Sequence, residues 1–165
     1  MSNNSKASRG PKITIERRYR ASLEDVWDLW TTKEGFESWW GPQGFRAEVH
    51  ELDARPGGAL RYDMVADSAE MIAAMKQMGQ PERHPTHSTF TELLPQRRIL
   101  LTNVIDFLVG VEPYQSQIGV DLWDEGGSVR MVVTLDQMHN AEFTKMQQDG
   151  FTSQLSKLDA RFPAA

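Results

Sequence analysis

The sequence predicts an α+β fold in which a curved antiparallel sheet of six to seven strands wraps around one long C-terminal helix, with two short helices after the first strand. Three observations support this prediction. Segments that alternate apolar and polar residues dominate the chain, two short helical patterns follow the first of them, and a long amphipathic pattern closes the sequence.

The first part of the chain predicts a strand followed by two helices. Residues 12–20 alternate apolar and polar side chains, which is typical of a strand with one buried face. Ser22 is placed to cap a helix over about 23–32, and a second short helix is expected to start at residue 33 or 34 and to run to about Trp39. A Gly-Pro pair immediately downstream must end that second helix.

The middle of the chain predicts antiparallel strands interrupted by one inserted helix. Residues 45–53 and 59–65 alternate and are joined by a turn in which Gly57 and Gly58 can supply the positive φ. Residues 68–79 depart from the strand period, because their apolar side chains fall at helical spacing. The remaining strands are expected over 88–95, 98–107, 114–123 and 128–136, and the final helix over about 140–161.

Length and composition indicate a single domain. The 165 residues are enough for one core over residues 12–165, after a polar segment, residues 1–11, that is expected to be a disordered tail. The chain contains no cysteine, which excludes disulfides, thiolate metal sites and a cysteine nucleophile. A net charge of −5 argues against a nucleic-acid partner, and no apolar run is long enough for membrane insertion. We expect a cytoplasmic protein.

No sequence motif for a metal, a cofactor or a nucleophile is present. His84 and His87 invite a metal interpretation, but residues three apart on an extended segment face opposite sides. The sequence contains no nucleophile elbow, phosphate loop, dinucleotide fingerprint or paired-histidine zinc helix. We therefore expect no metal and no cofactor, and we favour a role without catalysis.

Acid–base chemistry would need a titratable side chain inside the fold. Asp106, Glu92 and Tyr114 are the weak candidates for this role, because each falls on or next to a predicted strand. Asp106 ends an otherwise apolar strand, although a polar residue in that position also suits the cap of a turn.

A ligand site is better supported than a catalytic one, because a sheet wrapped around a helix leaves a space whose filling depends on the inward side chains. Met146, Gly150 and Gln154 share one line of the final helix, and glycine inside a helix is tolerated more readily where room is needed. Of the adjacent Trp39 and Trp40, the first is expected to anchor the helix pair and the second to reach the pocket rim. The inward strand parity is left open, and these residues could instead pack against one another. The other residues assigned to the pocket are Met64, Met75, Phe90, Thr102, Val104 and Met131.

Four segments together resemble a known superfamily. They are ASLEDVWDLWTTKEGFESWWGP, ELDARPGGALRYDM, FTELLPQRRILLT and DGFTSQLSKL. In this order they resemble the START-like superfamily, also called SRPBCC or Bet v 1-like, and within it most closely the family of homologues of the activator of heat-shock-protein-90 ATPase. The resemblance spans about residues 13–162 and implies the helix-grip fold. It leaves the function open, because members range from lipid and hormone carriers to polyketide cyclases and oxygenase subunits.

The resemblance and the Met-rich inserted helix favour the binding of a small apolar or aromatic molecule between the sheet and the final helix. One alternative is a cyclase- or hydratase-type enzyme with an acid or base in the same cavity. Another is a module that stimulates a chaperone or pairs with a regulator. A chaperone partner is not favoured, because nothing before residue 12 corresponds to the extra N-terminal domain of eukaryotic co-chaperones of this family. A homodimer is left open.

Overall fold

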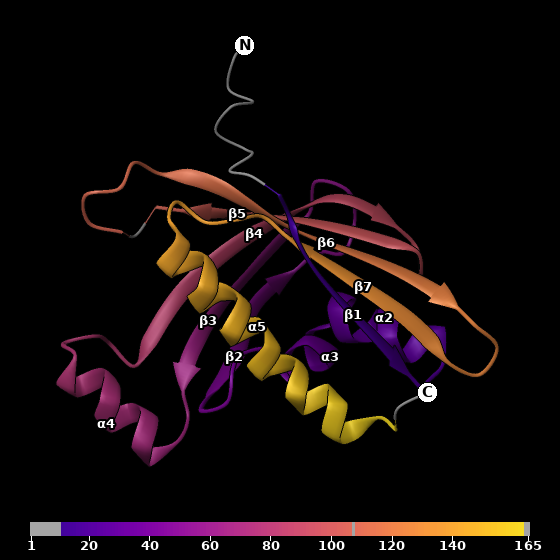
Figure 1. The fold of residues 1–165 in the computed structure, drawn as a ribbon, viewed down its shortest axis with the longest axis horizontal. Coiled ribbons are helices and arrows are strands. Elements are labelled where there is room, and N and C mark those ends of the chain that lie inside the picture. The colour runs from indigo at the N-terminus through magenta and orange to yellow at the C-terminus, as the bar shows by residue number, and fades with distance from the viewer. Residues whose placement is uncertain (1–10, 107, 164–165) are drawn as a thin grey trace, which may run out of the picture.

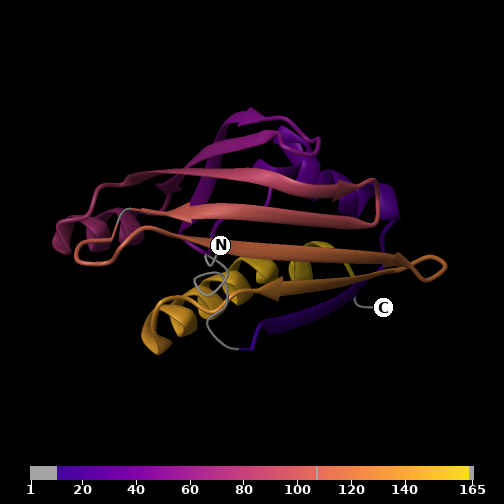
Figure 2. The same cartoon turned by 90° about the horizontal axis from the view of Figure 1, so that it is seen from above.

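The computed structural model describes residues 11–106 and 108–163. Within these residues, seven strands form one antiparallel sheet in the order β1-β7-β6-β5-β4-β3-β2 (Figure 1, Figure 2). The predicted disordered tail, residues 1–11, lies outside the described residues except for Pro11. The strands are β1 (Ile13–Tyr19), β2 (Phe45–Leu52), β3 (Ala59–Ala66), β4 (Arg83–Leu94), β5 (Arg98–Ile105), β6 (Tyr114–Asp124) and β7 (Val129–Leu135).

Each helix starts at a polar residue that caps its first turn. The side chains of Ser22, Thr32, Ser68 and Asn140 each accept a hydrogen bond from the backbone N–H three residues later. The last helix lies against the concave face of the sheet, which confirms the predicted α+β helix-grip fold (Figure 2). No helix in the described part of the chain combines the length and the apolarity needed to cross a bilayer. The helices are α2 (Leu23–Thr31), α3 (Lys33–Glu37), α4 (Ala69–Gln77) and α5 (Ala141–Arg161).

Burial identifies the face of the sheet that packs on α5. Ile99 and Leu101 of β5, Leu122 of β6, and Met131 and Val133 of β7 are fully buried in one apolar core. Because side chains alternate along a strand, the inward residues are odd-numbered in β5 and β7 and even-numbered in β6. The structure thereby identifies the inward parity that the sequence pattern left open.

Aromatic side chains fill the space between the sheet and the C-terminal half of α5. Trp39 Nε1 donates a hydrogen bond to the Leu29 carbonyl at 2.9 Å, and Trp40 Nε1 donates to the Tyr62 hydroxyl at 3.0 Å. The ring of Trp40 lies edge-on to those of Trp39 and Phe151, with centroids 5.2 Å and 5.7 Å apart. Both tryptophans of the adjacent pair therefore belong to the core. The cluster consists of Trp30, Phe36, Trp39, Trp40 and Phe151.

Strand β4 begins at Arg83, whereas the sequence pattern predicted a strand only from residue 88. The first part of β4 pairs with β3 alone, since its pairing with β5 begins at Ser88. Pro85 has no backbone N–H to donate, and it is tolerated here because one side of the strand has no partner strand. The proline therefore marks an edge of the sheet and not the loop that the sequence suggested.

Candidate ligand-binding site

The concave face of the sheet carries a row of polar side chains outside the aromatic core. Ser88 of β4, Asn103 of β5 and Ser116 of β6 are register neighbours and share this face. The Ser88 hydroxyl donates a hydrogen bond to Asn103 Oδ1, and both serines are buried. Such convergent polar groups on a mostly apolar face can orient a small molecule.

A pocket of about 470 Å³ opens on the same face, next to the segment that follows α4. Met64 pairs with His84 across the β3–β4 ladder, and Thr86 pairs with the buried Tyr62, so these lining side chains have the inward parity. The lining combines a flexible thioether and two prolines with polar groups, which makes it amphipathic. The lining residues are Met64, Gln80, Pro81, His84, Pro85 and Thr86.

The loop that joins α3 to β2 connects this pocket to α5. The Gly41 N–H donates a hydrogen bond to Gln154 Oε1 at 2.8 Å, and the Gln43 N–H donates to the Ser153 hydroxyl at 2.9 Å. Gly41 has a φ of +106°, and a Cβ there would lie 3.0 Å from Met64 Sδ, so glycine is strongly favoured. Met64 of the pocket and Gln154 of α5 are therefore neighbours of the same glycine.

Two further contacts hold this loop in place. The Lys157 ammonium group donates a hydrogen bond to the Phe45 carbonyl at 3.0 Å, and burial lowers the pKa of Lys157. On the other side, a Cβ at Gly44 would lie 3.1 Å from Met71 Cε, which places α4 against the loop. None of the residues of α4 is buried, so this helix packs only loosely on the rest of the protein.

Tyr62 links the aromatic core to the pocket. Its hydroxyl accepts the hydrogen bond from Trp40, and it also interacts with the side chain of Thr86. Burial raises the pKa of Tyr62 to about 12, although its hydrogen bonds with Trp40 and Thr86 oppose this increase. Tyr62 is therefore neutral near pH 7 and offers a hydroxyl group, not a charge.

Tyr114 of β6 lies on the inward face and meets His139, which precedes α5. Tyr114 Oη and His139 Nδ1 are 2.9 Å apart, and the His139 ring packs against Phe143 with centroids 4.5 Å apart. A phenol that is hydrogen-bonded to an imidazole can help to move a proton to or from a bound molecule. Sequence reasoning did not find His139 as a partner, because the two residues are 25 positions apart and share no motif.

The structure brings some of the predicted ligand residues to the pocket and places others in the core. Met64 lines the pocket, and Gln154 contacts the loop beside it. Phe90 and Met131 are fully buried in the apolar core, as is nearly all of Trp40. Met75, on α4, is half-buried.

Other predicted ligand residues lie away from the pocket. Thr102 and Val104 have the parity opposite to Leu101 and face the convex side of the sheet. Met146 is 57% exposed. A Cβ at Gly150 would meet no heavy atom within 4 Å, so the space beside this part of α5 is open. The assignment of these residues to a ligand site stays a prediction.

The candidate acid–base residues lie in three different environments. Asp106 is exposed directly after β5. The Glu92 carboxylate pairs with Arg98 at 2.9 Å on the convex side. Of the three candidates, Tyr114 is the one that shares the inward face with the pocket.

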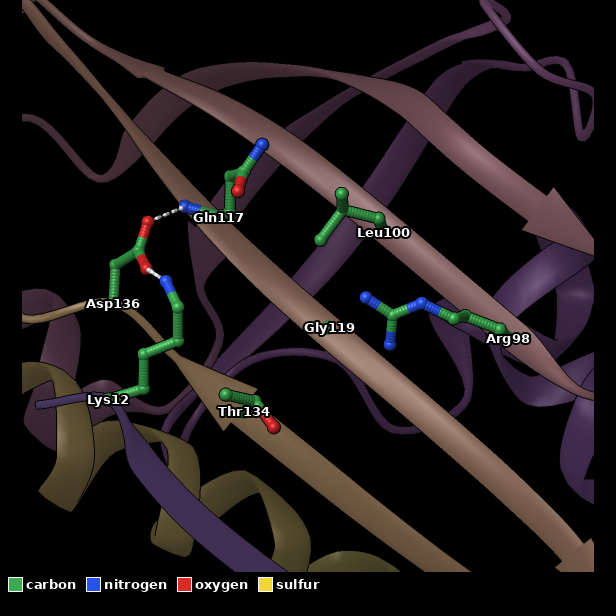
Figure 3. Close-up of a pocket in the computed structure, with 7 residues that line it drawn as sticks. All are labelled: Lys12, Arg98, Leu100, Gln117, Gly119, Thr134 and Asp136. Atoms are coloured by element: carbon green, nitrogen blue, oxygen red, sulfur yellow. Dashed lines mark hydrogen bonds and ion pairs between the residues drawn. The ribbon is translucent and has the colours of Figure 1, made fainter. Parts of the chain in front are cut away.

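A smaller pocket of about 150 Å³ lies on the convex face of the sheet (Figure 3). The Asp136 carboxylate there accepts a hydrogen bond from the Gln117 N–H at 2.9 Å and pairs with Lys12. At the other end of the pocket, Arg98 pairs with Asp121 at 2.9 Å. Because its charged groups are already paired and its volume is much smaller, we assign the candidate ligand site to the concave face.

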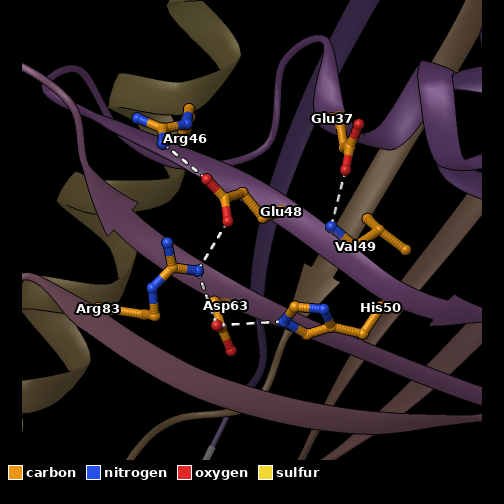
Figure 4. A network of polar contacts seen from close by, with 7 residues as sticks. All are labelled: Glu37, Arg46, Glu48, Val49, His50, Asp63 and Arg83. Atoms are coloured by element: carbon orange, nitrogen blue, oxygen red, sulfur yellow. Dashed lines mark hydrogen bonds and ion pairs between the residues drawn. The ribbon is translucent and has the colours of Figure 1, made fainter.

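A charged network on the convex side ties the start of β4 to β2 and β3 (Figure 4). The Arg83 guanidinium pairs with Glu48 at 2.7 Å and with Asp63 at 2.9 Å, and His50 Nε2 lies 3.1 Å from Asp63. Hydrogen bonds from Arg83 hold the pKa values of Glu48 and Asp63 below their usual range. Nearby, the Glu37 carboxylate of α3 accepts the Val49 N–H of the edge strand β2 at 2.8 Å.

The curved sheet wraps around the long C-terminal helix and has a pocket on its inward face. This arrangement is that of a START-like helix-grip domain. One family profile, described as Activator of Hsp90 ATPase homolog 1-like protein, matches residues 20–162. The chain therefore belongs to the Activator of Hsp90 ATPase homolog 1-like family, and its SRPBCC fold is that of a family of ligand-binding domains.

Solved structures with the same fold include three bacterial proteins. A protein from Chromobacterium violaceum matches with a TM-score of 0.74 and 22% identity, over 94% of this chain and 99% of that chain. An AHSA1 protein from Silicibacter pomeroyi has a TM-score of 0.69 and 19% identity, over 91% and 96% of the two chains. An AHSA1-like protein from Aeromonas hydrophila has a TM-score of 0.64 and 18% identity, over 91% and 93%. A comparison with curated proteins found no match.

Proposed function

We propose that the protein binds a small hydrophobic or aromatic molecule between the concave face of the sheet and α5. The observation that carries this proposal is the pocket of about 470 Å³ on the inward side of β3 and β4. Its volume falls in the range of roughly 300–1,000 Å³ that is usual for small-molecule sites.

Three features of the surrounding structure support binding at this pocket. The thioether of Met64 can adapt its shape to a guest molecule. The open space beside Gly150 leaves room for part of a ligand under α5. The neighbouring helix α4 buries none of its residues, so it can shift to admit a ligand at low cost.

The proposed partner is a small molecule, and the proposed location is the cytoplasm. A net charge of −5 offers little attraction for nucleic acid.

Acid–base catalysis in the same cavity is a second candidate function. The hydrogen bond between Tyr114 and His139 favours it, because this pair shares the inward face of the sheet with the pocket. The enzyme would be of the cyclase or hydratase type, with the Tyr114 hydroxyl as acid or base. Unchanged turnover in a Tyr114→Phe variant would exclude this role for the pair.

The binding proposal is tested by measuring the melting temperature of the protein with a panel of flavonoids, fatty acids and small polycyclic aromatics. A ligand present at about 100 times its Kd should raise the melting temperature by roughly 5–10 °C for a protein of this size. The pocket-filling variant His84→Trp should lose this response, because the new side chain occupies the cavity.

His87→Trp is the matched control, since it changes the same residue type on the same strand but on the opposite face. It should keep the ligand response of the unmodified protein. Equal loss of the response in both variants, or no response to any compound, would contradict binding in this pocket.

A further inference from the structure

Gln154 carries a buried hydrogen-bond donor that has no partner in the described part of the chain. The side chain is only 3% exposed, and its Oε1 accepts the Gly41 N–H at 2.8 Å. Because a backbone N–H requires an acceptor, this contact determines which end of the amide is the oxygen. Nε2 is left without a hydrogen bond to any described residue.

Buried donors of this kind are nearly always hydrogen-bonded, so the amide nitrogen of Gln154 calls for an acceptor. Trp30 Nε1 is also buried without an acceptor among the described residues, but it lies inside the aromatic core. The Trp30 ring is edge-on to those of Trp39 and Trp40, with centroids 5.1 Å and 5.5 Å away. A ligand could reach Trp30 only by opening that core.

Gln154, in contrast, lies near the candidate ligand site, because Gly41 is next to both Gln154 and Met64 of the pocket. Gly150 lies one helical turn before it on the same face of α5, beside open space. On the other side, Gly41 touches both the Gln154 amide and Met64, which lines the pocket. A change of rotamer at Met64 can extend the pocket toward the amide, because methionine side chains adapt readily.

We propose that the ligand carries a neutral hydrogen-bond acceptor, such as a ketone, lactone or ether oxygen, which binds Gln154 Nε2. This inference rests on the proposed function and adds the chemical class of the ligand. The apolar body of the molecule lies in the pocket at Met64. None of the pocket-lining residues has a permanent charge, which favours a neutral acceptor over a carboxylate.

A pair of nearly isosteric ligands tests this inference. Fluorenone and fluorene differ only in a carbonyl group, and equilibrium dialysis measures the affinity of each for the full chain. We expect fluorenone to bind about tenfold more tightly, because fluorene leaves the buried donor without an acceptor. In a Gln154→Met variant this preference should disappear, and continued binding of fluorene would report that the pocket is still formed.

Gln148→Met is the matched control, since Gln148 is an exposed glutamine of the same helix, and it should keep the preference for fluorenone. If Gln154→Met does not fold, Gln154→Glu keeps an acceptor for the Gly41 N–H. It should lower the fluorenone preference at a pH at which the introduced carboxyl is ionised.

The possible outcomes separate the inference from the proposed function. Equal affinities for the two compounds in the unmodified protein would overturn the role of Gln154 while leaving ligand binding in place. A fluorenone preference that survives Gln154→Met would overturn it too. Binding of neither compound would contradict the acceptor inference and would also count against the proposed function.

Discussion

A substitution at Gly150 is the simplest test of the open space beside α5. A Cβ at this position would meet nothing within 4 Å, and Gly150 lies inside a helix. Gly150→Ala should therefore raise the free energy of unfolding by roughly 0.5–1 kcal/mol, because alanine loses less backbone entropy in a helix. Chemical denaturation of the two proteins measures this difference.

Gly35→Ala is the contrasting variant, because Gly35 also lies in a helix but has no room for a side chain. A Cβ there would lie 2.0 Å from the Asp28 carbonyl oxygen, so this variant should be less stable than the unmodified protein. Destabilisation by Gly150→Ala would show that the space beside α5 is occupied by protein atoms.

The burial of a single residue was easier to predict from the sequence than its contacts with distant residues. Trp40 was expected to reach the pocket rim, but it lies in the core and donates a hydrogen bond to Tyr62. The contact of Gly41 with Gln154 joins residues 113 positions apart. No spacing rule connects such residues, because only the folded chain brings them together.

At the scale of elements, the Arg83 network should make the stability of the β2–β4 edge depend on pH. The folded-state pKa values of Glu48 and Asp63 are lowered, chiefly by their hydrogen bonds with Arg83. Their stabilising contribution is therefore present above their unfolded-state pKa values, near 4, and is lost as pH falls through the lower folded-state values. Arg83→Gln should reduce stability near pH 7 and have little effect near pH 2.

Denaturation of both proteins at a series of pH values measures this dependence. Arg55→Gln is a suitable control, because Arg55 pairs locally with Asp53 at 2.7 Å in a hairpin turn and does not join different strands. A difference between Arg83→Gln and the unmodified protein that stayed constant from pH 7 to pH 2 would contradict the role of these carboxylates.

Strands and helices with clear periodicity were predicted from the sequence almost to their ends, as α2 and β3 illustrate. The start of β4 was missed because Pro85 normally signals a loop, whereas here it lies where the strand has a partner on one side only. The inward parity of β5 to β7 was also left open, since both faces of these strands carry apolar residues. Packing against α5, and not the local sequence pattern, decides which face of these strands points inward.

At the scale of the whole molecule, the order of the segments was enough to predict the helix-grip fold, because few arrangements bury that succession of strands and helices. The pocket was not predictable in the same way. It forms where β3, the segment after α4 and the first part of β4 meet, and its size depends on side chains from all three regions. The sequence predicted a cavity between the sheet and the final helix. Several residues that it assigned to this cavity lie in the apolar core or on the convex face.

The most direct test of ligand binding on the concave face is an NMR titration of the isotope-labelled protein with fluorenone. We expect the largest chemical-shift changes at Met64, His84, Thr86 and Gly150, which border the pocket and the open space beside α5. Thr91 and Thr102, on the convex face, should change little. Shift changes confined to the convex face, or none at saturating fluorenone, would contradict a ligand site between the sheet and α5.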